Sequence, residues 1–382
     1  MSLALFYTFC VLVLFLYIIL ILYLNFHWNR LYISDIDSKQ NDLPFVSIII
    51  IGRNEEQNIK NCISSIAANN FPKEKYEIIY IDDESEDNSE KVLKSIKIEN
   101  FNYFRFNDIA SLPTTKNHKK EAIKAGIALA KGDIILQTDA DTIIEENWIY
   151  LHAVQYIDND NTGLVTAPVL YIEDNNFFLS KFQYYDLLTT MGITAAGISS
   201  NMFYMANGAN MSYRKKIFMT TKVDSKYASG DDMFLIQETA IKNTDNVIFL
   251  KDKNAVVYTF PEKTLIDFIR QRLRWASKTK GYKDRNLQLL VSFVFIVNLL
   301  VLINFALIFF LNTSQLIFFL ILFLIKLLVD SYFIFNISRF FGKKIDCGYL
   351  LLSLLVYPVY MTFIGITGLF TTKYKWKGRM VR

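Results

Sequence analysis

An uncharged apolar run near the N-terminus, Leu3–Leu24, is long enough to cross a membrane as a helix. At 1.5 Å per residue it would span roughly 33 Å, against about 30 Å for the hydrocarbon core of a bilayer. No basic segment precedes the run and no small-residue cleavage site follows it, so we expect a retained anchor over residues 1–26. Arg30 follows closely, and the positive-inside rule then places the N-terminus outside and the next domain in the cytoplasm.

Three further apolar runs form a predicted C-terminal membrane region over residues 286–372. They cover about residues 289–311, 315–337 and 349–370. Basic residues at positions 339–344 assign the loop between the last two runs to the cytoplasm. The basic tail, residues 373–382, should be cytoplasmic by the same rule, although three complete crossings would place it outside. We therefore expect Pro358 to break the last run into a re-entrant or interfacial element.

Two charged residues, Lys326 and Asp330, lie inside the second of these runs. Their i, i+4 spacing places them on one face of a helix, where they can pair. Charges within a membrane segment are a functional hypothesis by default, but we favour a structural ion pair between helices here.

Charge and rare side chains exclude several classes of protein. The net charge of +4 comes with basic residues gathered near the apolar ends, which fits a membrane surface and gives no continuous basic stripe for nucleic acid. Three widely spaced cysteines suggest neither a disulfide framework nor a zinc site. The histidines, His27, His118 and His152, show no ligand spacing, so we expect no catalytic or metal-binding role for them.

The polar middle of the chain, residues 44–262, alternates strand-like and helix-like segments. Phe45–Ile51 is nearly continuous in apolar, β-branched residues, which is typical of a strand buried on both faces. A helix should follow it with Asn54 as its N-cap. Further strands are predicted at residues 77–81, 101–106 and 133–138, and a second helix at residues 119–130. This βαβα order predicts an α/β fold with a mostly parallel central sheet covered by helices on both faces.

Polar clusters follow three of these strands at the point where each strand ends. They are Arg53-Asn54, Asp82-Asp83 and the pair Asp139 and Asp141. Ligands bind parallel sheets at the carboxyl ends of the strands, so the clusters should converge on one crevice.

The best-defined chemistry belongs to Asp139 and Asp141, whose side chains share a face of an extended segment. Two carboxylates suit a hard cation such as Mg²⁺ or Mn²⁺, held together with substrate phosphates. A solvated acidic turn is the alternative for such a pair taken alone. Asp82 and Asp83 are placed to meet the base and ribose of a nucleotide, or to take part in helix capping. Lys119 opens the helix before the acidic pair and can meet the phosphates, unless it is only a solvated helix end.

A second acidic pair, Asp231 and Asp232, follows Ser229-Gly230 and precedes an apolar helix. Mutual repulsion should raise the pKa of one carboxyl, and one is a candidate general base for an acceptor hydroxyl. N-capping of the helix is the alternative, and we expect one residue to cap and the other to act. Residues 263–284 then predict an amphipathic interfacial helix, in which Arg274 is placed to clamp a diphosphate.

With these residues the chain resembles a membrane-bound family-2 glycosyltransferase with the GT-A (nucleotide-diphospho-sugar transferase) fold, over about residues 45–282. Ile48–Glu56 resembles that family's opening strand and donor-binding turn, Asp82-Asp83 its uridine-contacting motif, and Asp232 its catalytic base. The resemblance also implies that Asp139 and Asp141 bind metal. It implies a further set of sites: Gln271, Arg274 and Trp275, as the Gln-x-x-Arg-Trp signature over the diphosphate and acceptor; Asn207, Gly208, Asn210 and Asp231, on the acceptor side; and Arg53, Asn54 and Glu55, at the donor.

Three positions depart from the family pattern. Gly52 stands where Pro or Ala is commoner, Lys124 where Asn is common, and Asp231 where Glu is more usual. The first two departures leave the identity of the donor open.

By this resemblance the reaction would be an inverting transfer from a nucleotide-sugar, for which we expect a UDP-linked donor. The acceptor would be a lipid or a lipid-linked glycan at the cytoplasmic membrane face, with membrane lipids as the other partner and no nucleic acid. A processive polysaccharide synthase is the closest alternative, although four apolar segments are few for an export channel. The alternative from another class is a non-catalytic membrane subunit that binds a nucleotide-sugar. A subunit that had lost its activity should lack at least one of Asp139, Asp141, Asp232 and Arg274, and all four are present. The oligomeric state stays open.

Overall fold

The computed structural model describes residues 3–32, 42–109, 118–157, 159–172, 177–221, 231–242, 246–310, 313–371, 374–376 and 379–381. Of the basic tail it thus describes two short strands, and Ser229-Gly230 lies outside the described residues.

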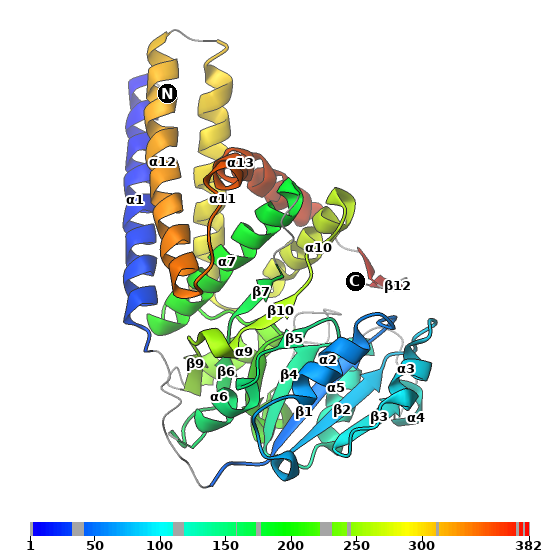
Figure 1. Ribbon diagram of the computed structural model, residues 1–382. Helices are drawn as coiled ribbons and strands as arrows, with labels where there is room; N and C mark the ends of the chain where they lie inside the picture. Colours follow the sequence, from blue (N-terminus) through cyan, green and yellow to red (C-terminus); the bar gives the residue numbers. More distant parts are fainter. Residues whose placement is uncertain are drawn as a thin grey trace.

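A seven-stranded sheet forms the centre of the polar domain, in the order β3-β2-β1-β4-β8-β6-β9 (Figure 1). The strands are β1 (Val46–Gly52), β2 (Tyr76–Asp82), β3 (Phe101–Arg105), β4 (Ile134–Asp139), β6 (Leu164–Thr166), β8 (Met211–Arg214) and β9 (Val247–Phe249). Strands β3, β2, β1 and β4 are parallel, and β8 is antiparallel to both of its neighbours. The predicted α/β fold with a mostly parallel sheet is therefore confirmed. A smaller sheet joins β5 (Ile143–Ile144), β10 (Val257–Thr259) and β7 (Val169–Tyr171).

Helices cover both faces of the central sheet because β1 is apolar on both faces. Ile48 and Ile50 belong to the core that includes α2 (Ile59–Ala67) and α6 (Trp148–Val154). Ile49 and Ile51 belong to the opposite core with α5 (His118–Leu129) and α7 (Phe178–Ser199). The remaining short elements are α3 (Ser89–Ser95), α4 (Phe106–Ile109), α8 (Lys215–Thr220), α9 (Asp231–Lys242), η1 (Lys73–Lys75), η3 (Lys253–Ala255), η4 (Lys278–Gly281), β11 (Tyr374–Trp376) and β12 (Arg379–Val381).

The helix after β1 begins later than predicted, and its N-cap residue is Asn58 instead of Asn54. Asn54 has a positive φ of 54°, which an N-cap with extended backbone does not have. Its side-chain oxygen accepts a hydrogen bond from the backbone N–H of Glu86, 2.8 Å away. Asn54 therefore belongs to a turn tied to the loop after β2, and the prediction of its capping role was wrong.

Within the described residues, four helices are long and apolar enough to cross a membrane: α1 (Leu3–Arg30), α11 (Arg285–Leu307), α12 (Thr313–Phe340) and α13 (Cys347–Phe370). In Figure 1, α1, α11 and α12 run side by side, whereas α13 runs in another direction and packs against α11, α7 and α10 (Leu265–Ser277). Pro358 lies inside α13 without interrupting it, so the predicted break in this helix was wrong. The change of direction comes from the loop between α12 and α13.

The charged pair inside α12 is satisfied by neighbouring helices. The ammonium of Lys326 lies 2.6 Å from Asp330 Oδ2, and the hydroxyl of Tyr17 in α1 donates to Asp330 Oδ1 at 2.6 Å. Lys326 also lies over the ring of Tyr357 in α13, 5.8 Å from its centroid. The ion pair therefore lies within α12 and not between helices as we favoured, while its contacts with Tyr17 and Tyr357 join three helices.

The membrane helices are anchored on the polar domain through Lys251, which follows β9. Its ammonium donates to the carbonyl of Trp28 at the end of α1, 2.7 Å away. It also lies 4.4 Å from the centroid of the Trp28 ring and 4.9 Å from that of Phe340 at the end of α12. The C-terminal ends of α1 and α12 therefore face the polar domain.

Candidate active site

The carboxyl ends of β1, β2 and β4 meet at one edge of the sheet, as the strand pattern predicts. Gly52 is paired with Asp82 across β1 and β2, and Ile51 is paired with Asp139 across β1 and β4. The turn after β1, the acidic loop after β2 and the acidic pair after β4 therefore start next to one another.

Hydrogen bonds hold the turn after β1 against the loop after β2. The buried guanidinium of Arg53 donates to the carbonyls of Asp83, at 2.8 Å, and of Glu84, and pairs with Glu86 at 2.6 Å. The backbone N–H groups of Asn54 and Glu55 donate to the hydroxyls of Ser85 and Ser89, both at 2.9 Å. The residues predicted to bind the donor thus shape the loop after β2.

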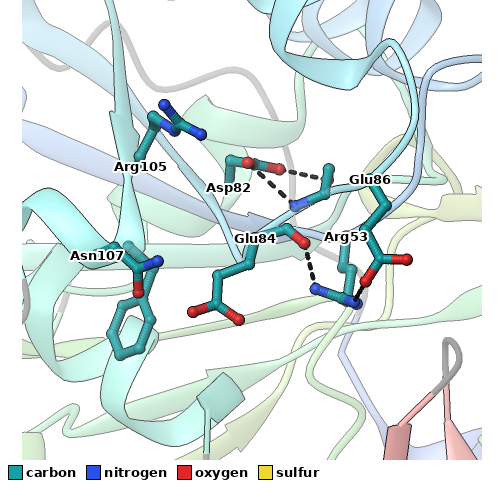
Figure 2. A pocket seen from close by; sticks show the side chains of 8 residues that line it. Arg53, Asp82, Glu84, Glu86, Arg105 and Asn107 are labelled. Atoms are coloured by element: carbon teal, nitrogen blue, oxygen red, sulfur yellow. Dashed lines mark hydrogen bonds and ion pairs between the residues drawn. The ribbon is translucent and has the colours of Figure 1, made fainter. Parts of the chain in front are cut away.

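A cavity of about 500 Å³ opens beside this loop (Figure 2). Its lining comprises Arg53, Asp82, Glu84, Ser85, Glu86, Arg105, Phe106 and Asn107. Figure 2 shows Arg105 and Asn107 on one side and Arg53 and Glu86 on the other, with Asp82 at the back. Burial raises the pKa of Asp82, while its carboxylate accepts hydrogen bonds from the backbone and the hydroxyl of Ser85. Small-molecule sites commonly have about this volume, so the cavity is large enough for part of a nucleotide.

The carboxylate of Asp139 lies 2.9 Å from the ammonium of Lys119 at the start of α5. Burial raises the pKa of Asp139, but the charges of Lys119, Arg274 and Lys278 outweigh burial and leave the pKa below its ordinary value. Asp141 follows two residues later, and its Oδ2 lies 3.5 Å from the hydroxyl of Thr259 in β10. The two carboxylates are hard oxygen donors of the kind that Mg²⁺ and Mn²⁺ prefer. The residues present therefore fit a divalent cation.

A second group of potential metal ligands consists of Asp83, Glu84 and His118, whose ligand atoms all lie within 4.8 Å of one another. The Nδ1 atom of His118 is 3.4 Å from Asp83 Oδ1. Sequence spacing did not indicate this group because it joins the end of β2 to the start of α5. We therefore expected no such role for His118, yet its position allows one.

The two carboxyl groups at the start of α9, those of Asp231 and Asp232, have different surroundings. Asp232 Oδ2 accepts a hydrogen bond from the backbone N–H of Gly208 at 3.0 Å, and Oδ1 accepts one from Met233 at 2.9 Å. Burial and the charge of Asp232 raise the pKa of Asp231 to about 6, although Lys120, Lys119 and Lys278 oppose this shift. Gly208 thus brings the predicted acceptor-side segment into contact with the predicted base. The neighbouring Asn207 side chain accepts from the Ala209 N–H at 3.0 Å.

The predicted interfacial helix is α10, followed by η4. Its N-cap is Thr264, whose hydroxyl accepts from the N–H of Asp267 at 3.1 Å. The charge of Arg274 acts on Lys119, Asp139 and Lys278, so the helix reaches the edge of the sheet where the acidic clusters lie. The side chain of Gln271 accepts from Arg272 at 2.7 Å and donates to Glu262 at 3.0 Å.

Known proteins share this arrangement of motifs. The family model described as "Glycosyl transferase family 2" matches residues 47–221. A probable glycosyltransferase of Bacillus subtilis, YdaM, is 25% identical over 335 residues, which cover 85% of this chain and 74% of that protein. Residues 47–221 of this chain form a family-2 glycosyltransferase domain. A mannosyltransferase from Pyrobaculum calidifontis, solved with GDP-Man and Mn²⁺, shares the GT-A fold with a TM-score of 0.56. It is 14% identical, and the match covers 95% of this chain and 96% of that chain.

Other relatives of this glycosyltransferase match only part of the chain. The β-monoglucosyldiacylglycerol synthase of Nostoc is 29% identical over 144 residues, 38% of this chain and 30% of that protein. The poly-β-1,6-N-acetyl-D-glucosamine synthase of Staphylococcus aureus is 29% identical over 156 residues, 41% of this chain and 36% of that protein. The chain therefore spans less than half the length of either synthase.

One predicted acceptor-side residue of the glycosyltransferase, Asn210, lies inside the protein. Its side chain is fully buried, and its amide nitrogen donates to the carbonyls of Pro168 and Ala255 at 2.7 and 2.8 Å. Its side-chain oxygen accepts from the Trp148 indole at 2.8 Å and lies 3.0 Å from His152 Nε2. Asn210 therefore supports the segment that carries Gly208, and the prediction that it contacts the acceptor does not fit this placement.

Sequence reasoning missed a buried ion pair that holds the signature helix of the glycosyltransferase. The Nε and Nη2 atoms of Arg272 lie 3.0 and 2.9 Å from Asp186 Oδ2 in α7. The guanidinium lies 4.2 Å from the ring centroid of Trp275, and the hydroxyl of Tyr360 in α13 also donates to Asp186, at 3.4 Å. We call Asp186, Arg272 and Tyr360 the α10 brace, because it joins the helix of Gln271, Arg274 and Trp275 to α7 and α13.

The departure at Gly52 has a structural explanation. A Cβ atom at this position would lie 1.8 Å from the hydroxyl oxygen of Tyr80 and 3.1 Å from the Cβ of Ala140. Tyr80 is fully buried in β2, and its ring fills the space that a Pro or Ala side chain would take.

Gly52→Ala is accordingly expected to destabilise the glycosyltransferase by about 1–3 kcal/mol through overpacking. The rigid, buried ring of Tyr80 has little room to move away from the new methyl group. The midpoint of thermal unfolding in detergent measures this effect. The double variant Gly52→Ala/Tyr80→Leu should lose less stability than the sum of the two single variants, whereas additive losses would show that the two side chains do not compete for this space.

Proposed function

We propose that this glycosyltransferase moves a sugar from a UDP-linked donor to a lipid or lipid-linked acceptor, with inversion at the anomeric carbon. The observation that carries the proposal is the meeting of Lys119, Asp139 and Arg274 with Asp232 at the carboxyl edge of the sheet. This chemistry needs cations that bind a diphosphate, carboxylates that bind a metal and a separate carboxylate that accepts a proton. The catalytic domain would be residues 44–262, completed by α10 within residues 263–284.

Asp232 is proposed to accept the proton of the acceptor hydroxyl as that hydroxyl attacks the anomeric carbon. The N–H of Gly208 holds the carboxylate in place at 3.0 Å. Lys119 and Arg274 would stabilise the departing diphosphate through charge-assisted hydrogen bonds. Asp139 and Asp141 would hold a divalent cation, which when bound neutralises charge developing on the leaving group.

The proposal of a lipid acceptor rests on the surface beside α10. Leu265 and Ile266 in its first turn are 59% and 62% exposed, and Phe177 and Phe260 in neighbouring segments are also exposed. The helix packs against α13, one of the four apolar helices. This apolar surface adjoins the signature residues and would let the headgroup of a lipid reach the site while its chains stay in the bilayer.

The cytoplasmic placement of the catalytic domain is likewise a proposal. Arg30 and Arg339 lie in the last turns of α1 and α12, the ends that face this domain. The ammonium of Lys343 lies 5.4 Å from the ring centroid of Tyr258 in β10, so the basic loop contacts the domain directly. Basic helix ends favour the cytoplasmic side. Four apolar helices offer little for a polymer channel, which favours single transfer over processive synthesis.

Asp139→Ala tests the proposed metal site. It should weaken Mn²⁺-dependent UDP binding at least about a hundred-fold, because even indirect partners of metal ligands often contribute that much to metal affinity. Calorimetric titration of the full chain in detergent, with and without Mn²⁺, measures the loss. The exposed Asp133, just before the other end of β4, gives a matched control, and Asp133→Ala should bind normally. Equal metal affinity in Asp139→Ala and the native chain would refute the assignment.

A further inference from the structure

A lysine just beyond the signature motif is buried without a partner. Lys278 begins η4, and only 9% of its surface is exposed. Among the described residues, its ammonium forms no ion pair and donates no hydrogen bond. Lys278 falls within the predicted interfacial helix, residues 263–284, but its burial keeps it from facing lipid headgroups.

Most of the Lys278 side chain is withdrawn from water, and a charge that loses water without gaining a partner destabilises a folded protein. Burial lowers the pKa of Lys278 to about 8, and the charges of Arg274 and Lys119 act in the same direction against the opposing effect of Asp232 and Asp231. Three cations, Lys119, Arg274 and Lys278, are thus held close enough to repel one another. Such an arrangement is expected where an anionic ligand completes the site.

We propose that Lys278 binds the diphosphate of the sugar donor, as a third cation beside Lys119 and Arg274. The proposal rests on the proposed function, since it assumes a nucleotide donor. Lys278 lies four residues after Arg274, a spacing that brings the two side chains to one face of a helix. It is also one of the charges that lower the pKa of Asp139, the residue assigned to the donor's metal. A phosphate on an acceptor lipid has the same chemistry, and the charge of Asp232 also acts on Lys278, but the grouping with Lys119 and Arg274, both proposed to bind the diphosphate, favours the donor.

Lys278→Met is the informative variant, because methionine keeps most of the side-chain length and removes the charge. We expect it to weaken nucleoside diphosphate binding by about ten-fold to a hundred-fold, the loss of one charge-assisted hydrogen bond or a little more. Lys278→Arg should retain most of the affinity. The exposed Lys263 near the other end of α10 provides the matched control, and Lys263→Met should bind like the native chain.

The measurement is calorimetric titration of the full chain in lipid nanodiscs with Mn²⁺ and UDP, GDP or dTDP, using the nucleotide that binds the native chain most tightly. Thermal unfolding without nucleotide provides a second readout. Lys278→Met should unfold at the same temperature as the native chain or a higher one, because it removes an unpaired buried charge. A lysine with a purely structural role would lower that temperature.

The possible outcomes separate the two proposals. Failure of the native chain to bind any of the three nucleotides would reject the proposed function itself. Native binding with an unchanged affinity in Lys278→Met would overturn the role of Lys278 alone. An unchanged nucleotide affinity with a raised KM for a phosphorylated lipid acceptor would assign Lys278 to the acceptor and likewise overturn the donor assignment.

Discussion

Asp232→Asn is expected to reduce kcat for sugar transfer by about a hundred-fold to ten-thousand-fold, the usual contribution of a positioned general base. The amide keeps the shape of the carboxylate and its contact with the Gly208 N–H, but it cannot accept the hydroxyl proton. Donor binding should stay nearly intact, because the proposed metal ligands, Asp139 and Asp141, are untouched. Steady-state kinetics of nucleotide release and calorimetric titration of the donor on the same preparation separate the two effects.

The adjacent carboxyl provides the control for this experiment. Asp231→Asn makes the same chemical change one residue away, at a group whose pKa is already raised to about 6 by burial and by Asp232. It should reduce kcat much less than Asp232→Asn does. A larger loss in Asp231→Asn, or an equal loss of donor binding and turnover in Asp232→Asn, would remove Asp232 from the role of base.

Breaking the α10 brace should produce the largest loss of stability. Asp186→Leu leaves the guanidinium of Arg272 buried without its carboxylate, and breaking such a pair usually destabilises a protein by about 3–5 kcal/mol. The double variant Asp186→Leu/Arg272→Met removes both charges and should recover most of that stability, because apolar side chains of similar volume often replace a buried pair at little cost. Chemical denaturation in detergent, followed by tryptophan fluorescence, measures both.

Turnover gives this experiment a second readout. The double variant should stay folded but lose kcat, because the brace positions the helix that carries Gln271, Arg274 and Trp275. Full activity in the stable double variant would show that the ion pair serves stability alone. Equal stability of the single and double variants would show that Arg272 finds another partner when Asp186 is absent.

The sheet and the candidate site could be predicted from sequence because they follow local rules. Continuous β-branched runs mark strands buried on both faces, and the carboxyl ends of parallel strands share one edge. The polar clusters after β1, β2 and β4 could therefore be brought together without coordinates. The membrane helices could also be predicted from the sequence, since length and apolarity alone determine whether a helix can cross a bilayer.

What the sequence could not predict depends on partners distant in the chain. Arg272 and Lys278 look alike on a helix rich in basic residues, yet Arg272 meets Asp186 while Lys278 is buried without a partner among the described residues. Asn210 looks like a substrate ligand until its neighbours Trp148 and Ala255 are known. Pro358 indicated a broken helix, but the change of direction lies in the loop before α13.

The most direct test of the account is nucleotide release by the purified chain in lipid, measured with UDP-, GDP- and dTDP-sugars in the presence and absence of Mn²⁺. The account predicts metal-dependent release from one donor, which a lipid acceptor stimulates and which the Asp232→Asn variant reduces at least about a hundred-fold. Release that neither needs the metal nor depends on Asp232 would contradict it.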